Sequence, residues 1–489
     1  MHLLALSALL SVLAGSTHAP VLPSIPKGQL VESIASESLP FQRFTVYLPT
    51  SYDPSRPAPI IYLMDPRGRA RVAAKLFRPA AERYGYILMS SHNSTSDGPA
   101  ELNLHAMQAM WNDSHEWFTI DQRRVYVAGF SGTARIASLM AHNLPNSITG
   151  IMGSAAAYHP DVRPSRDSKF LYFGTVGNTD YNFHEMESLE QALVSKDSPH
   201  RVERFTGSHS WMPPDLAMQA VEWMELRAMQ SGTRLRDPQL IDAWWQRSLE
   251  AVRAALDEGQ HLDAARRLSG MARDFAGLRD TTAPRAEAAQ ISSTPAVKNQ
   301  LKRRQADGRR SREWLSHVMG VIADAFPAGA DSPVRPPAEL AQALELARLK
   351  RVAAGPPGEE ALEAQRRLNE IEVQLGFYLP VEAVEVSEPR RADYYLSVAL
   401  QIDDRSPVSW YLLGRTCAHL DAEGDALAAL RRAFEAGFRD LALLEADPAF
   451  KDLRDDPGYA AIVGLLRDSG DVLDRLTVDR PPAHMVPLR

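Results

Sequence analysis

One stretch of the sequence, Val125 to Ala141, constrains the fold more than any other. It opens with four uncharged residues, three of them apolar, which are typical of a buried strand, and it closes with apolar residues at helical spacing. A tight turn, Gly129-Phe130-Ser131-Gly132, lies between them. A chain that turns this sharply places the Ser131 hydroxyl on the bend, with room above it left by Gly132. The Gly132 N–H lies beside it at a helix N-terminus, where negative charge is favoured.

The turn departs from the full Gly-x-Ser-x-Gly pattern at one position, because Thr133 stands where the last glycine is expected. That glycine allows helix and strand to pack closely. We expect Thr133 to widen this packing or to shift the helix, without removing a catalytic group. An ordinary strand–turn–helix junction is the alternative, because a short motif is a hypothesis until its context agrees.

Strand-like and helix-like segments alternate around this turn. Antiparallel edge strands are expected at 28–39 and 41–49, and buried strands at 59–64, 86–91, 125–128, 148–155, 169–175 and 201–205. Helices are expected at 73–84, 101–117, 185–194 and 214–229. The alternation predicts an α/β fold, a mostly parallel sheet with helices on both faces. Ligands bind such sheets beyond the carboxyl ends of the strands, so partners of Ser131 are expected in those loops.

A serine hydroxyl needs a base to take its proton, and the base needs an anion to hold its tautomer. The candidate anion is Asp180, in the polar turn that follows strand 169–175. Asp161 and Asp167 precede that strand and would lie at the wrong end of it. The alternative role for Asp180 is to cap the following helix, a frequent use of aspartate.

The candidate base is His209, in the glycine-containing turn that follows strand 201–205. Its order after Ser131 and Asp180 is the Ser, Asp, His order of α/β-hydrolase triads. Two other histidines are less suitable, because His184 would lie on or beside a helix and His200 precedes its strand.

Catalysis by Ser131 would also need two N–H donors for the developing negative charge. The Gly132 N–H is one candidate, and the N–H of Arg67 or Gly68, in the loop after strand 59–64, is the other. The alternatives for this loop are a plain turn with surface arginines, or binding of a substrate carboxylate by the side chains of Arg67 and Arg69.

Composition excludes several other classes of function. A net charge of −7 provides no basic face for nucleic acid. The single cysteine, Cys417, excludes intramolecular disulfides and a cysteine-based metal cluster, and no metal-ligand spacing of His, Asp or Glu occurs in the sequence.

The apolar run from Leu3 to Leu13 precedes small residues up to Ala19, the layout of a signal peptide cleaved after Ala19. The run is too short to span a bilayer. An uncleaved, buried N-terminal helix is the alternative. We therefore expect an exported protein, secreted or periplasmic, with no membrane span.

From about residue 238 the strand-like runs stop. Two helices are expected over 238–278 with a break at Gly259, a loop or loose helix over 279–300, and a capping helix over 441–467. Residues at tetratricopeptide spacing occur within 407–440, namely Trp410, Leu413, Gly414, Ala426, Leu430 and Ala433. A generic helical hairpin is the alternative for one such repeat.

These boundaries predict six parts of the chain. They are a signal peptide (1–19), an α/β domain (28–232), a helical region (238–326), a linker (327–337), a tetratricopeptide-like helical region (338–470) and a tail (471–489).

Four stretches together carry a family resemblance: Asp65 to Gly68, Arg124 to Gly132, Gly174 to Asp180, and Gly207 to Trp211. On them, residues 28–230 resemble the esterase group of α/β-hydrolases that includes feruloyl esterases and polyhydroxyalkanoate depolymerase-type enzymes. The resemblance implies Ser131 as nucleophile, His209 as base and Asp180 as acid, and it implies no zinc or organic cofactor. The helical tail resembles tetratricopeptide-type modules fused to exported bacterial hydrolases.

The leading hypothesis is an exported serine hydrolase that cleaves a small-molecule or polymeric ester through an acyl-enzyme. A serine peptidase-like amide hydrolase is the closest alternative. The alternative from another class is a catalytically idle α/β-hydrolase scaffold whose helical tail binds a protein partner, since helical repeats provide such surfaces.

Overall fold

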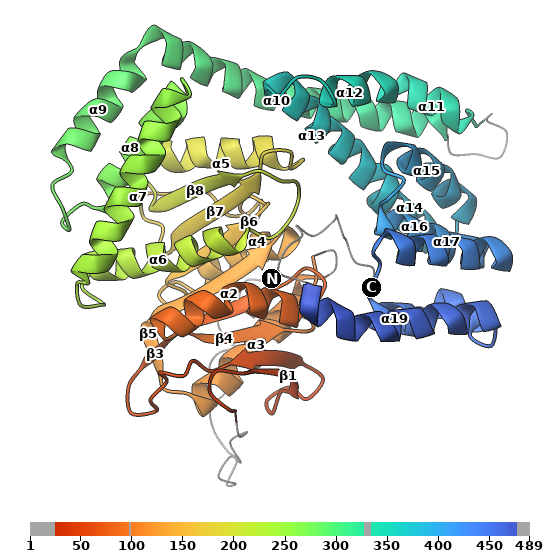
Figure 1. The fold of residues 1–489 in the computed structure, drawn as a ribbon, viewed down its shortest axis with the longest axis horizontal. Helices are drawn as coiled ribbons and strands as arrows, with labels where there is room; N and C mark the ends of the chain where they lie inside the picture. The colour runs from red at the N-terminus through yellow and green to blue at the C-terminus, as the bar shows by residue number, and fades with distance from the viewer. Residues whose placement is uncertain (1–24, 97–98, 327–333, 477–489) are drawn as a thin grey trace. The chain divides into compact units, whose positions relative to one another are not determined.

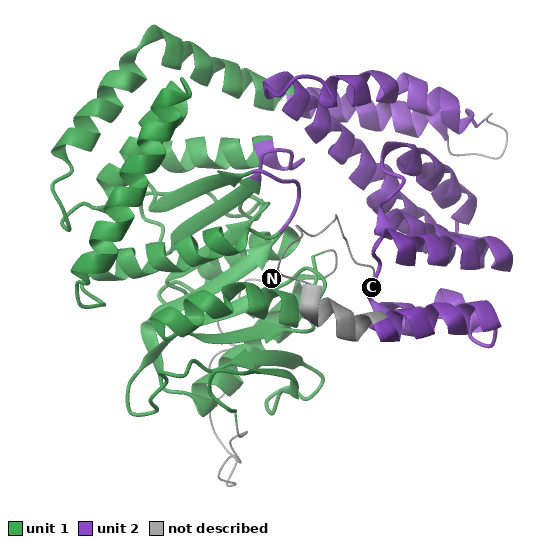
Figure 2. Ribbon diagram, in the orientation of Figure 1, with its two compact units in different colours: residues 1–176, 184–205, 211–310 green, residues 177–183, 206–210, 311–489 purple. Residues whose placement is uncertain are grey.

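The computed structural model describes residues 25–96, 99–326 and 334–476 (Figure 1). The predicted signal peptide, most of the predicted linker and the end of the predicted tail lie outside these residues. Two compact units make up the chain (Figure 2). Unit 1 contains residues 1–176, 184–205 and 211–310, and unit 2 contains residues 177–183, 206–210 and 311–489.

A single sheet of eight strands, in the order β1-β2-β4-β3-β5-β6-β7-β8, forms the centre of unit 1. The strands are β1 (Leu30–Ala35), β2 (Arg43–Tyr47), β3 (Ala58–Met64), β4 (Ile87–Ser91), β5 (Ile120–Phe130), β6 (Gly150–Ser154), β7 (Leu171–Gly177) and β8 (His200–Phe205). Strand β2 is antiparallel to β1 and β4, whereas the pairs β3–β4, β3–β5, β5–β6 and β6–β7 are parallel. The predicted α/β fold, a mostly parallel sheet with helices on both faces, is confirmed.

Helices cover both faces of this sheet, because successive side chains of a buried strand point to opposite faces. They are α2 (Ala70–Tyr84), α3 (Ala100–Trp117), α4 (Gly132–Asn143), α5 (Phe183–Ser195) and α6 (Pro214–Gln230). In β3, Ile61 and Leu63 join the apolar cluster that contains Phe77 of α2. The intervening Tyr62 points the other way, and its hydroxyl lies 2.7 Å from Ser114 Oγ of α3.

The structure moves the start of one predicted strand in unit 1 and decides between the two alternatives for one segment. Strand β5 begins at Ile120, not Val125, because a bulge lets Ala58 pair with Ile120 and Ile60 with Val125. The segment 279–300, expected as a loop or loose helix, forms α9 (Thr282–Ser293) and the start of α10 (Pro295–Ala325). The two predicted helices over 238–278 are confirmed as α7 (Pro238–Asp257) and α8 (His261–Asp274), with Gly259 between them.

The C-terminal part of unit 2 is helical. Its elements are α11 (Pro337–Ala343), α12 (Leu346–Ala353), α13 (Glu359–Val373), η1 (Gln374–Tyr378), α14 (Leu379–Glu385), α15 (Pro389–Ile402), α16 (Pro407–His419), α17 (Glu423–Ala436), α18 (Leu441–Ala446), η2 (Pro448–Leu453) and α19 (Pro457–Leu476). Helices α16 and α17 pack closely, since a Cβ on Gly414 would lie 3.0 Å from Leu430 Cγ. The tetratricopeptide assignment of this hairpin stays a prediction.

The single capping helix expected over 441–467 is wrong. The segment instead forms α18, η2 and α19, because Asp447 ends the first helix and Pro448 cannot continue it. The Asp447 carboxylate accepts the Ala449 N–H at 2.9 Å and so caps the next segment.

Among the helices of the described residues, none is both long enough and apolar enough to cross a membrane. The same residues contain no group of three or more His, Cys, Asp or Glu side chains placed to hold a metal ion.

Candidate active site

Ser131 occupies the bend between β5 and α4 in a backbone conformation that serine rarely adopts. Its φ is 55° and its ψ is −128°, outside the regions favoured by L-residues. The bend is held on both sides, because the Ser131 N–H donates to Ser154 O of β6 at 2.9 Å and the Ala134 N–H donates to Ser131 O at 3.0 Å. Such strain at a strand-to-helix turn is the conformation that exposes a nucleophilic serine.

Thr133 has a structural role at this bend. Its side chain is fully buried, and Oγ1 accepts the Phe130 N–H at 3.1 Å. The same oxygen lies 2.6 Å from Met64 O and 2.8 Å from Phe130 O, either of which can accept its proton. The hydroxyl therefore ties the start of α4 to the ends of β3 and β5. Gly129 is needed here, because a Cβ at that position would lie 2.6 Å from Thr133 O.

The space above Gly132 is occupied by protein. A Cβ on Gly132 would lie 2.5 Å from the Ser96 Cβ, and the Ser96 N–H donates to Pro66 O at 3.2 Å. Glycine is therefore required at this position because the Ser96 segment approaches it closely, which is a reason additional to the space that the sequence argument reserved above Ser131. The Gly132 N–H begins α4, where the first N–H groups have no acceptor within the helix.

The two other candidate oxyanion donors are engaged within their own loop. The Arg67 N–H donates to Asp65 Oδ1 at 2.9 Å, and the Gly68 N–H donates to Asp65 O at 3.0 Å. Gly68 has a φ of 64°, and a Cβ there would lie 2.1 Å from His92 O, so this turn requires glycine. Either amide would have to exchange its present acceptor before it could bind a substrate oxygen.

Asp65 organises this loop from a fully buried position. Its carboxylate accepts two hydrogen bonds of 2.9 Å from the Arg69 guanidinium and one of 2.8 Å from Trp211 Nε1. Burial alone would raise the pKa of this carboxyl, but Arg69, Trp211 and the Arg67 N–H together hold the pKa below its usual range. The Arg69 side chain is thus committed to Asp65, which argues against the alternative that it binds a substrate carboxylate.

Asp65→Asn should therefore destabilise unit 1. We expect the free energy of unfolding at neutral pH to fall by about 3 kcal/mol, because the change removes one partner of a buried ion pair. A carboxyl whose pKa is depressed by folding stabilises the protein above its unfolded pKa, and this contribution is lost as pH falls through the folded pKa. The wild-type advantage should accordingly shrink in acid.

Chemical denaturation of wild type and Asp65→Asn, carried out from neutral pH into the acid range, measures the difference in free energy of unfolding. Asp167→Asn, at an exposed position, is the control and should leave stability within about 0.5 kcal/mol. Equal stability of Asp65→Asn and wild type at neutral pH would contradict this account of Asp65.

Unit 2 brings the predicted base and acid together. His209 Nδ1 lies 3.0 Å from Asp180 Oδ1, and both side chains are buried. The Tyr181 ring stacks on the His209 ring, with centroids 4.2 Å apart and planes 24° apart. The second oxygen, Asp180 Oδ2, is buried and has no hydrogen-bond partner among the described residues. The pair thus contains the hydrogen bond between imidazole and carboxylate that orients the base of a catalytic triad.

Asp180 also shapes the turn before α5, although the residue directly before this helix is Asn182. Oδ1 accepts the Asn182 N–H at 2.8 Å, and the Phe183 N–H donates to Asp180 O at 3.0 Å, in a turn that leads into α5. One carboxylate therefore both shapes the entry to this helix and orients the imidazole.

The loops that carry these two residues are joined directly. The Thr179 N–H donates to Gly207 O at 2.9 Å, and the Gly207 N–H donates to Asn178 Oδ1 at 3.1 Å. A Cβ on Gly177 would lie 2.4 Å from Gly207 O, so glycine is required for this approach. The carboxyl ends of β7 and β8 hence lie together, as the sequence argument required.

The rival residues lie elsewhere. Asp161 and Asp167 are exposed. His200 is buried at the start of β8, with Nδ1 2.8 Å from Ser198 O, and burial lowers its pKa. The hydrogen bond from Ser131 in unit 1 to His209 in unit 2, which would complete a triad, stays a prediction.

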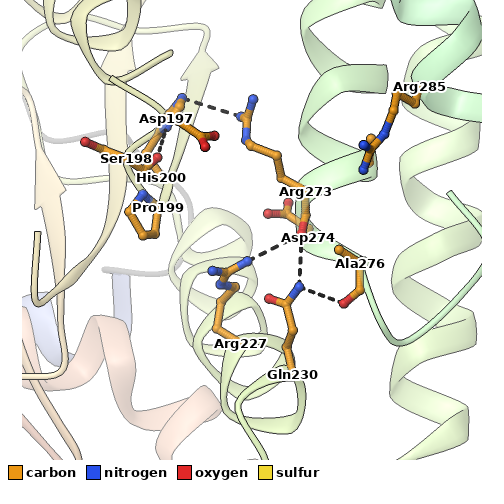
Figure 3. A pocket seen from close by; sticks show the side chains of 11 residues that line it. Asp197, Ser198, Pro199, His200, Arg227, Gln230, Arg273, Asp274, Ala276 and Arg285 are labelled. Carbon is orange, nitrogen blue, oxygen red and sulfur yellow. Dashed lines mark hydrogen bonds between the residues drawn. The ribbon is translucent and has the colours of Figure 1, made fainter. Parts of the chain in front are cut away.

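A polar pocket of about 260 Å³ lies at the amino end of β8 and contains none of the predicted site residues (Figure 3). Gln230 Nε2 donates to Arg273 O at 3.2 Å and Ala276 O at 2.8 Å, and Arg227 also donates to Arg273 O, at 3.4 Å. These side chains satisfy carbonyls at the end of α8. The side chains that line the pocket therefore join α6 to the end of α8.

No protein-family profile and no curated protein matches the chain. Similar solved structures include S-formylglutathione hydrolase from Staphylococcus aureus, with 13% identity, 41% of this chain and 98% of that chain covered, and a TM-score of 0.33. The feruloyl esterase module from Clostridium thermocellum shows 15% identity, coverage of 42% and 90%, and a TM-score of 0.32. Esterase 2 from Thermogutta terrifontis shows 13% identity, with 44% of this chain and 96% of that chain covered, and a TM-score of 0.33. Because one fold hosts many activities, the function has to be argued from the side chains of this chain.

Proposed function

We propose that this chain is a serine hydrolase that cleaves carboxylic esters through an acyl-enzyme, with Ser131, His209 and Asp180 as its triad. The observation that carries the proposal is the buried hydrogen bond between His209 Nδ1 and Asp180 Oδ1, 3.0 Å long. A carboxylate that accepts the Nδ1 proton leaves Nε2 of the ring as the proton acceptor, the tautomer that a general base requires. The strained bend at Ser131 supports the same assignment for the nucleophile.

The reaction then proceeds in two halves. Ser131 Oγ attacks the ester carbonyl carbon while its proton moves to His209 Nε2, and the carbonyl oxygen becomes an oxyanion beside the Gly132 N–H. The bond to the alcohol breaks, and His209 gives its proton to the leaving oxygen. Water next loses a proton to His209 and attacks the acyl-enzyme, which releases the carboxylic acid and restores the Ser131 hydroxyl.

Substrate panels test this function. The purified protein is assayed against short-chain aryl esters, an aromatic-acid methyl ester, an aliphatic polyester and the amide analogues of the aryl esters. We expect turnover of at least one ester and none of the matched amides. Turnover of amides alone would favour the peptidase alternative. No turnover of any substrate, with no labelling by a fluorophosphonate, would favour an idle scaffold whose helical tail binds a protein partner.

We also propose that the protein is exported, to the periplasm or the medium, on the strength of the apolar run Leu3 to Leu13 and the small residues up to Ala19. N-terminal sequencing of the protein expressed from its full coding sequence should give a start at residue 20. A mature chain that retains Met1 would contradict export by this route.

A further inference from the structure

The segments that carry the candidate base and acid belong to the same compact unit as the C-terminal helices. Residues 177–183 and 206–210 group with residues 311–489, and Figure 2 shows both segments in the colour of those helices. The two segments follow β7 and β8 in the chain, so sequence order alone assigns them to the sheet. Their contacts within unit 2 therefore need an explanation.

Helix α13 holds the acid-bearing segment by two side-chain hydrogen bonds. Arg366 Nε donates to Asn178 O at 2.8 Å, and Asn369 Nδ2 donates to Thr179 O at 2.7 Å. Arg366 and Asn369 are three residues apart and so lie on one face of the helix. The two carbonyls that they bind immediately precede Asp180 in the chain.

Arg366 is itself held in place. Its side chain is 4% exposed, and Nη1 lies 2.6 Å from Glu359 Oε1 and 3.2 Å from Glu363 Oε2. The guanidinium carbon lies 3.9 Å from the centroid of the Phe183 ring, at the other end of the acid-bearing segment. A buried cation paired with two carboxylates and stacked on an aromatic ring is a rigid donor, because few rotamers satisfy all of these contacts at once.

The other sides of Asn178 and Thr179 face the base-bearing segment. The Asn178 side chain accepts the Gly207 N–H, and the Thr179 N–H and hydroxyl both donate to Gly207 O, at 2.9 and 2.8 Å. Two residues thus connect α13 to the backbone just before His209. Tyr181 makes a second connection, since its ring stacks on His209 and packs against the apolar cluster of the C-terminal helices.

We propose that α13 is part of the catalytic apparatus, with Arg366 and Asn369 as positioning residues that set the alignment of Asp180 and His209. The proposal rests on the proposed function and deepens it. It explains why the loop beside Asp180 gives its carbonyls to a helix that begins about 180 residues later in the chain. The C-terminal helices would then be required for catalysis and would not be an independent appendage.

The test compares the full-length variants Arg366→Lys and Asn369→Ala with wild type. Lysine keeps the charge but cannot reproduce the planar, multiple-donor geometry of arginine. We expect kcat to fall by about 10- to 100-fold in the double variant, because a misplacement of about 1 Å in a catalytic group costs up to about 10²-fold. KM should stay within about twofold, since neither residue touches substrate.

The two kinetic parameters separate positioning from a merely structural role. A His209 that lies less favourably against Asp180 takes the Ser131 proton less readily, which lowers kcat and leaves substrate binding unchanged. The split between kcat and KM therefore identifies a positioning role. Arg367→Lys on the same helix is the matched control, and it should match wild type in both kcat and KM.

Nuclear magnetic resonance of ¹³C-labelled histidine makes the test independent of activity. The ring ¹³C signal of His209, assigned by its loss in His209→Gln, should change its chemical shift at a fixed pH in Arg366→Lys/Asn369→Ala, and should match wild type in Arg367→Lys. This change is expected even if the protein cleaves no ester, so failure of the proposed function and failure of this inference are distinguishable. An unchanged His209 chemical shift in a folded double variant would overturn the inference.

Discussion

Ser131→Ala should abolish ester hydrolysis while leaving the protein folded. The change removes one oxygen atom from a half-buried side chain whose backbone bonds to Ser154 and Ala134 do not involve the hydroxyl. Loss of the nucleophile of a serine hydrolase lowers kcat by about 10⁵- to 10⁶-fold. Steady-state kinetics on the best ester of the panel measures the loss, and thermal unfolding shows that the fold is retained.

Ser188→Ala is the control for this experiment. Ser188 is exposed on α5, and its hydroxyl donates to His184 O of its own helix at 2.8 Å. Its removal should leave kcat and KM within about twofold of wild type. If Ser131→Ala hydrolysed the ester at the wild-type rate, Ser131 would not be the nucleophile and the bend that exposes it would have no catalytic use.

Asp180→Asn should have the second largest effect. Asparagine has nearly the shape of aspartate, but its amide can donate to Nδ1, which favours the wrong tautomer of His209 and removes the charge that stabilises the imidazolium. A drop in kcat of about 10⁴-fold is expected, the size found for this change in a serine-protease triad. KM should change little, because Asp180 is buried behind the imidazole.

The same substitution at Asp161, the rejected rival, serves as the comparison. Asp161 is exposed, and its Oδ2 atom lies 3.6 Å from His159 Nδ1. Asp161→Asn should keep full activity, and a large loss of kcat in this variant with none in Asp180→Asn would reverse the assignment of the acid.

Much of the fold could be predicted because local pattern and packing agree. The strands β3, β4, β6 and β7 are buried on both faces of the sheet and consist of uncharged runs bounded by turn residues. Prediction from the residue pattern failed where packing against neighbouring elements decides the secondary structure. The polar residues 121–124 extend β5 because a bulge accommodates them beside β3. The segment 279–300 has few apolar residues, yet it is helical.

The candidate site, too, could be predicted from the sequence only in part. Chain order and strand ends were sufficient to select Asp180 and His209, which the structure places 3.0 Å apart. Arg366 and Asn369 could not be selected, because donation to a main-chain carbonyl leaves no residue pattern at the acceptor and the partners are 188 and 190 residues apart. The engagement of the Arg67 and Gly68 N–H groups by Asp65 was also invisible, since it depends on how the turn closes.

The central claim is that Ser131 is made nucleophilic by the His209–Asp180 pair, and locating a covalent adduct tests it most directly. Wild type, Ser131→Ala and His209→Ala are treated with a fluorophosphonate and digested, and the peptides are analysed by mass spectrometry. The account predicts one adduct, on Ser131, in wild type, no adduct in Ser131→Ala, and labelling of Ser131 in His209→Ala that is slowed by orders of magnitude. An adduct on another serine, or equal labelling of Ser131 with and without His209, would contradict it.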